Sequence, residues 1–215
     1  MIVNYPPSLI TTFQEVVTNV KTAKLAELQT YDATIQDISF LAGNVHEVAK
    51  RMQEKTMDVT ERKKQYPLFI LLLDFTIERG KSSFYGRANN LNIIIANHTL
   101  ESYTSQQRDA LNFENILRPL YYEFLRQISK HPAFTEYTER KIPHNMTERY
   151  FWGVDAQTKN TLGKYIDAID ITNLSLNINW NYCLTPITSP FKLSSSLRFC
   201  VIGVLLFNCS SSPSN

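Results

Sequence analysis

Hydrophobic residues are most clearly patterned in the stretch 66–120, which predicts a buried strand, a second strand and a long helix. Residues 67–73 form a short, continuous apolar run, as in strands that are covered on both faces or that lie at a protein–protein boundary. A polar segment, 74–81, separates this run from a second apolar, β-branched run at 91–96. We therefore expect the two runs to pair as an antiparallel hairpin at the centre of the fold.

Two segments show the three- and four-residue spacing of an amphipathic helix. The first follows Ser8, a candidate N-cap, and its apolar positions are Ile10, Phe13, Val16, Val17 and Val20. The second runs over 103–131, and its apolar positions are Ala110, Phe113, Leu117, Leu120, Tyr121, Phe124 and Ile128. The pattern predicts that both helices cover one face of the sheet.

The region between the first helix and the central strand predicts smaller elements. Ile35, Ile38 and Phe40 suggest a strand that ends at Ala42-Gly43, and a short helix is predicted at 45–52. The charged segment 54–64 has no periodicity and is typical of a solvated loop.

The clearest alternation along the chain is in the segment 169–180. Ile169 and Ile171 have one phase and Leu174, Leu176, Ile178 and Trp180 the other, so we expect a β-bulge near Asn173. The residues between the apolar positions are uncharged and polar, which indicates an antiparallel strand with one buried face. The preceding segment, 131–163, is rich in charged and aromatic residues and is interpreted as an extended excursion from the sheet.

Together these elements predict an α+β fold: an antiparallel β-sheet with two main helices packed on one face, an extended excursion and a C-terminal tail. Residues 1–182 should form a single domain and 183–215 the tail. The apolar run in the tail, 197–207, is about half the length of a membrane-spanning helix and contains Arg198, so we expect no membrane attachment. An exposed apolar strand would be prone to aggregate, so the tail should dock on a neighbouring subunit.

Composition narrows the functional classes. The formal net charge is +2, with basic and acidic residues interspersed, which argues against sequence-specific nucleic-acid binding. The three cysteines lie in the last part of the chain without paired spacing, which is more typical of a reduced compartment than of a disulfide framework. The N-terminus resembles no signal peptide, so we expect the protein to stay in the cell that makes it.

The sequence offers little support for catalysis. No phosphate-binding loop, dinucleotide fingerprint or paired metal-ligand spacing is evident, so we expect no enzyme activity, metal or cofactor. Asp74 and Glu78, with Lys81 after them, superficially resemble the carboxylates and lysine of metal-dependent nucleases, although the spacing differs from the usual Glu-x-Lys. A divergent nuclease that uses Asp74 and Glu78 is therefore the alternative, and a membrane protein attached by the tail is a third possibility.

The aromatic triplet Tyr150, Phe151 and Trp152 is the remaining unusual feature, because three consecutive aromatic side chains in an extended segment cannot all face one core. It forms either a loop folded over the sheet edge or a subunit contact, where Tyr, Trp and Arg supply much of the binding energy. The predicted contact residues are Arg149, Tyr150, Phe151 and Trp152, with Val201, Leu205 and Phe207 in the tail.

The order of these segments resembles that of small virion proteins at the head–tail junction of tailed bacteriophages. The similarity rests on segments 66–74, 91–99, 103–108, 116–121, 149–153 and 165–171. The resemblance implies a non-catalytic tail terminator, tail-completion protein or head–tail connector that assembles as a closed ring, hexameric or, for a connector, twelvefold. It further implies contacts with other copies and with neck or tail-tube proteins, and a place in the virion after assembly in the bacterial cytoplasm.

Overall fold

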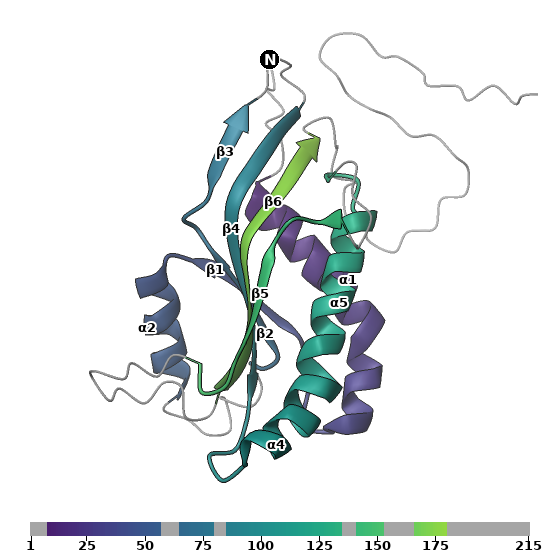
Figure 1. Ribbon diagram of the computed structural model, residues 1–215, viewed down its shortest axis with the longest axis vertical. Helices are drawn as coiled ribbons and strands as arrows, with labels where there is room; N and C mark the ends of the chain where they lie inside the picture. Colours follow the sequence, from purple (N-terminus) through teal and green to yellow (C-terminus); the bar gives the residue numbers. More distant parts are fainter. Residues whose placement is uncertain (1–7, 57–64, 80–84, 135–140, 153–165, 180–215) are drawn as a thin grey trace, which may run out of the picture.

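The computed structural model describes residues 8–56, 65–79, 85–134, 141–152 and 166–179 (Figure 1). The elements in chain order are α1 (Leu9–Tyr31), β1 (Ser39–Gly43), α2 (Val45–Thr56), β2 (Leu68–Leu72), β3 (Thr76–Arg79), β4 (Tyr85–His98), α4 (Ser105–Arg108), the π-helix η1 (Asp109–Leu117), α5 (Arg118–Lys130), β5 (Asn145–Arg149) and β6 (Ile166–Asn179). Helices and a largely antiparallel sheet are both present, so the predicted α+β class is confirmed.

The described strands form one sheet in the order β1-β2-β4-β6-β5, and β3 also pairs with β4. Only the β1–β2 pair is parallel among these strands. β2 pairs with the second half of β4 and β3 with its first half, so these two short strands share one edge of the long strand. The predicted antiparallel pairing of 67–73 with 91–96 is confirmed, although β3 separates the two strands in the chain.

Helices α1 and α5 cover one face of the sheet, as the sequence predicts (Figure 1). The Ser8 side chain accepts a hydrogen bond from the Ile10 N–H at 3.2 Å, which caps α1 at its predicted start. The Phe124 ring on α5 lies 6.2 Å from the Phe13 ring on α1 and 5.4 Å from the Phe69 ring on β2. These aromatic contacts join both helices to the central strand in a single apolar core.

The other face of the sheet has a cover of its own, α2 (Figure 1). Val48 and Met52 of α2 are buried with Ile70 of β2, Ile94 of β4 and Ala168 of β6. The sheet is therefore the middle layer of three over this part of its surface, which explains why four consecutive residues of the apolar run, 68–71, are all buried.

The bulge predicted near Asn173 is present, and β4 has a second one beside it. Between Leu91 and Ile93 the facing strand β6 has an extra residue, whereas between Ala88 and Leu91 the extra residue is in β4. Asn173 and Asn90 have φ values of 54° and 58°, in the left-handed region that Asn tolerates better than most residues. The two bulges compensate, so the register is the same on both sides of them.

The predicted long helix is continuous from Ser105 to Lys130, but its central part is π-helical. A capping box starts it: Thr104 Oγ1 accepts from the Gln107 N–H and the Gln107 side chain accepts from the Thr104 N–H. The Arg118 N–H donates to the Phe113 carbonyl, five residues back, just before Pro119. Pro119 has no N–H to donate, so the backbone hydrogen bonds of the helix are interrupted at this residue in either geometry. The change from π-helix to α-helix occurs at this interruption.

Three predictions about strands need correction. β1 covers Ser39–Gly43, so Ile35 and Ile38 precede the strand as buried residues, and Gly43 belongs to it. The polar segment 74–81 contains β3, whose residues are all exposed. The excursion 131–163 contains β5, which pairs with β6, so it adds an edge strand to the sheet. The predicted loop 54–64 overlaps the end of α2, and its residues 57–64 lie outside the described ranges.

Within the described ranges, no helix is both long enough and apolar enough to cross a membrane.

Candidate subunit-contact site

The candidate site is the turn that follows β5 at the edge of the sheet, where Arg149, Tyr150, Phe151 and Trp152 lie in succession. Strand β5 is held against the helical layer by Arg118. The Arg118 guanidinium donates to both carboxylate oxygens of Glu148, at 2.7 and 2.9 Å, and to Asp109 Oδ1 at 2.7 Å. This fork fixes the strand that carries the aromatic residues.

The backbone of the turn is held in an unusual conformation. Phe151 has φ = 54°, which is unfavourable for a bulky side chain. Two hydrogen bonds maintain it: the Phe151 N–H donates to Asp167 Oδ1 at 3.2 Å and the Trp152 N–H donates to the Ile166 carbonyl at 2.8 Å. The start of β6 therefore sets the direction in which the aromatic side chains point.

A fully buried arginine lies under the turn. Arg108 donates from Nη1 to Asp167 Oδ1 at 2.8 Å, from Nη2 to the Leu100 carbonyl at 2.9 Å and from Nε to the Tyr103 carbonyl at 3.3 Å. Its guanidinium carbon lies 3.8 Å from the centre of the Phe151 ring, the geometry of a cation–π contact. The Phe151 ring thus rests on a buried cation that is itself fixed by an ion pair.

The network continues inward through two amides. Asn112 Nδ2 donates to the second Asp167 oxygen at 2.9 Å, and Asn97 Nδ2 donates to Asn112 Oδ1 at 2.8 Å. Both members of the Arg108–Asp167 pair have fully buried side chains. Because the two charges are paired and hydrogen-bonded on several sides, the cost of burying them is offset.

The three aromatic side chains lie in different surroundings. Tyr150 packs at 4.8 Å between ring centres against Phe113 and is 38% exposed, and Phe151 is 39% exposed above Arg108. Trp152 is half-buried and packs against the apolar cluster on the α2 side of the sheet. The turn thus presents Tyr150 and Phe151 together at the surface, while Trp152 anchors it to the core.

Arg149 forms an ion pair with Asp170 of β6. Burial raises the pKa of Asp170 above its ordinary value, and the interactions with Arg149 and Trp152 oppose this rise. Asp170 Oδ1 is buried and has no hydrogen-bond partner among the described residues. This carboxylate thus links β6 to Arg149 and Trp152 of the exposed turn.

Sequence reasoning identified the aromatic triplet but missed the network beneath it. Arg108 and Asp167 are 59 residues apart, and an arginine in the first turn of a helix is ordinarily solvent-exposed. The only available sequence signal was the aspartate at the start of the apolar strand β6, a position where a charge needs a partner.

The other predicted residues lie elsewhere. Val201, Leu205 and Phe207 are outside the described residues, so their role stays a prediction. Asp74 and Glu78 are both exposed: Asp74 accepts from Asn92 Nδ2 at 3.3 Å, and Glu78 lies opposite Arg87 in the β3–β4 ladder. Over the ranges that the structure describes, no three His, Cys, Asp or Glu side chains are grouped as metal ligands would be.

Comparison with known proteins does not assign the chain to a family, since no protein-family model and no curated protein matches it.

Proposed function

We propose that this protein is a structural subunit of a bacteriophage neck or tail, of the tail terminator, tail-completion or head–tail connector type, and that it acts by assembling into a closed ring. Its partners are then other copies of itself and the adjacent neck or tail-tube proteins, and its place is the virion. The resemblance in segment order suggests this class. The rigid, exposed aromatic turn is the observation that supports a contact function.

The aromatic turn has the properties of an interface anchor. Tyr150 and Phe151 expose large apolar surfaces, while an unusual backbone conformation and a buried ion pair hold them in place. A side chain that is already ordered loses little conformational entropy on binding, so its contact area contributes more fully to affinity. Such a feature has little use in an isolated monomer.

The position of the turn fits a ring. It lies at one edge of the sheet, next to β5, and β1 lies at the opposite edge. In a cyclic ring each subunit contacts its two neighbours through two different surfaces, one on each side. An anchor on one edge can therefore meet a different surface of the next copy.

Truncation of Phe151 tests the proposal. Phe151→Ala should weaken self-association by about 2 kcal/mol or more. It should lower the unfolding free energy of the subunit by no more than about 1–2 kcal/mol, the contribution of the cation–π contact with Arg108, because the ring is otherwise partly exposed. Tyr122→Ala on α5 is the matched control, since this aromatic residue is 65% exposed and remote in sequence from the turn. Native mass spectrometry over a dilution series measures association, and urea unfolding measures stability.

The outcome can contradict the proposal in two ways. If the intact protein remains a monomer at micromolar concentration, alone and with its structural neighbours, it is not a ring subunit. If Phe151→Ala instead lowers the unfolding free energy by about 3–5 kcal/mol, the residue belongs to the core and the turn is not the contact. The corresponding prediction for Trp152 gives a less direct test, because this side chain packs partly against the α2-side cluster.

A further inference from the structure

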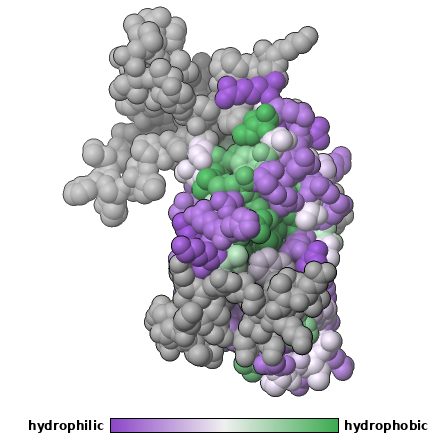
Figure 2. Space-filling model, turned by 90° about the vertical axis from the view of Figure 1, so that its left-hand side faces the viewer, coloured by the Kyte–Doolittle hydropathy of each residue, from purple (hydrophilic) through white to green (hydrophobic). Residues whose placement is uncertain are grey.

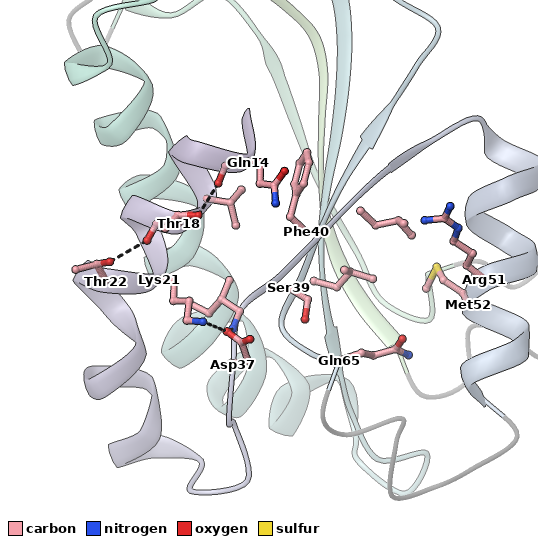
Figure 3. Close-up of a pocket in the computed structure, with 14 residues that line it drawn as sticks. Gln14, Thr18, Lys21, Thr22, Asp37, Ser39, Phe40, Arg51, Met52 and Gln65 are labelled. Carbon is pink, nitrogen blue, oxygen red and sulfur yellow. Dashed lines mark hydrogen bonds and ion pairs between the residues drawn. The ribbon is translucent and has the colours of Figure 1, made fainter. Parts of the chain in front are cut away.

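The edge of the sheet opposite the aromatic turn contains a groove with a volume of about 690 Å³. Its walls come from α1 on one side of β1 and from α2 on the other, and β1 itself forms the floor (Figure 3). This volume lies within the range of about 300–1,000 Å³ that is usual for ligand clefts. The groove is therefore large enough to hold a segment of polypeptide.

Strand β1, the floor of the groove, has one edge that no described strand pairs with. The Ser39 N–H donates to the Pro67 carbonyl at 2.9 Å, and the Gly43 carbonyl accepts from the Leu73 N–H at 3.1 Å. In a parallel pair alternate residues bond to the neighbouring strand, so Phe40 and Ala42, between them, point their N–H and C=O groups outward. β1 ends the described sheet, and no described strand pairs with these groups.

A buried side chain in the groove also has an unpaired donor. Gln65 is 8% exposed and lines the groove, and its Nε2 has no hydrogen-bond partner among the described residues. Figure 3 shows this amide beside β1, on the side of α2. A buried amide donor without a partner is unfavourable, so a carbonyl from a chain bound in the groove would satisfy it.

The charges at the rim are already paired within the subunit. Lys21 Nζ lies 2.7 Å from Asp37 Oδ1 on the α1 side, and Arg51 Nη2 lies 2.6 Å from Glu47 Oε1 on the α2 side. An occupant of the groove therefore needs no charge of its own. Leu73, which follows β2 and bonds to Gly43 at the end of β1, is 41% exposed. Figure 2 shows apolar surface between polar patches on the left-hand side of the molecule as it is drawn in Figure 1.

A strand added to β1 would lie between two helices, so both of its faces would be covered. Such a strand needs apolar side chains at consecutive positions. Residues 199–207 of this chain, Phe-Cys-Val-Ile-Gly-Val-Leu-Leu-Phe, have this pattern and no charge, and they lie outside the described residues. The preceding residues, 180–198, can span about 60 Å when extended, which is enough to reach an adjacent subunit.

We propose that segment 199–207 of one copy pairs as an added strand with β1 of the neighbouring copy, in the groove between α1 and α2. Backbone hydrogen bonds to Phe40 and Ala42 provide the pairing, and the Gln65 amide donates to the incoming chain. This inference rests on the proposed ring assembly and identifies one of its contacts. The contact is heterologous, since a tail on one side of each subunit fills a groove on the other side.

Variants of the full-length chain test the proposal. Thr18→Arg places a long side chain in the groove, from an exposed position of α1, and Asn19→Arg makes the same change at the adjacent exposed residue, which does not line the groove. Val201→Asp/Leu205→Asp places charges in the tail strand. Light scattering measures the assembled mass, and circular dichroism with urea unfolding verifies that each variant is folded.

We expect Asn19→Arg to assemble like the intact protein, and the groove variant and the tail variant each to lose at least tenfold in association. An equimolar mixture of the two defective variants is the decisive sample. The groove variant still has a functional tail and the tail variant a functional groove, so the mixture should form a dimer but no ring. Ala42→Pro provides a second groove variant, because it removes an outward N–H and leaves the bonds to β2 in place.

The failures are distinguishable. If the intact protein forms a ring and both groove variants form the same ring, the inference is wrong while the proposed function stands. If the mixture contains only monomers, the tail does not bind the groove of another copy, and the inference is again wrong. If the intact protein never self-associates, the proposed function fails, and the inference fails with it.

Discussion

Replacing Asp167 by Asn would remove the negative charge beneath the aromatic turn with almost no change in side-chain shape. The carboxylate accepts three hydrogen bonds, from Arg108, from Asn112 and from the Phe151 N–H. After the substitution, the Arg108 cation would remain fully buried without a counter-ion, and an amide NH₂ would face one of the donors. Breaking a buried pair in this way costs about 3–5 kcal/mol of unfolding free energy.

An exposed ion pair is the internal control for this prediction. Glu47→Gln breaks the pair with Arg51, in which both side chains are about half exposed, and should cost about 0–1 kcal/mol. Urea unfolding at pH 7 and at one protein concentration, followed by circular dichroism, measures both changes. The double-mutant cycle of Asp167→Asn with Arg108→Met should give a coupling energy of about 0.5–3 kcal/mol.

Equal destabilisation of the protein by Asp167→Asn and Glu47→Gln would contradict this prediction. Equal effects would mean that the Arg108–Asp167 pair contributes no more than a surface pair, despite its complete burial. A coupling energy near zero would likewise show that the two residues act independently.

Two further predictions concern single sites. Burial lowers the pKa of His131 below its ordinary 6.5, an effect that the hydrogen bond from its ring to the Glu15 carboxylate opposes. The folded state therefore favours neutral His131, and its stabilising contribution should be complete above about pH 6.5 and lost as the pH falls towards the folded-state pKa. His131→Gln should reduce this loss, as urea midpoints at pH 7.5 and pH 5.5 would show, and an unchanged pH profile would contradict the assignment. At the bulge, Asn173→Val should lower the unfolding free energy by about 1–2 kcal/mol, because a β-branched residue is unfavourable at φ = 54°, whereas Asn173→Gly should leave it nearly unchanged. Thermal unfolding compares the two variants, and equal effects would mean that the backbone conformation does not determine the choice of residue.

The sequence predicted the elements whose hydrophobic pattern is dictated by burial. The helices that contain Phe13 and Phe124, the strand around Phe69 and the phase change near Asn173 all place apolar residues towards the core. The short edge strands were missed for the same physical reason. β3 is fully exposed and β5 nearly so, so their side chains show no alternation between a buried and a solvated face.

The candidate site was predicted in part. The aromatic triplet is visible in the sequence because its residues are consecutive, and the placement of Tyr150 and Phe151 at the surface agrees with the argument that the three cannot share one core. The support beneath them could not be predicted, because Arg108 and Asp167 come together only when the long helix packs beside the start of β6. Hydrophobic periodicity gives no information about which buried charges will pair.

The paired bulges in β4 and β6 determine where the chain can change length. Ala88, Leu91 and Ile93 of β4 each have a fixed partner in β6. The extra residue of each bulge lies between two of these paired positions. Loss of Asn90 or Asn173 would turn one bulge into regular strand without changing any pair. Loss of a residue such as Ile95 would instead exchange the two faces of the remainder of the strand, so Ala96 would leave the α2-side cluster and Asn97 would lose its hydrogen bond with Asn112. Single-residue deletions should therefore be tolerated in this sheet at the two asparagines, and an evolving chain could shorten there while it keeps its core.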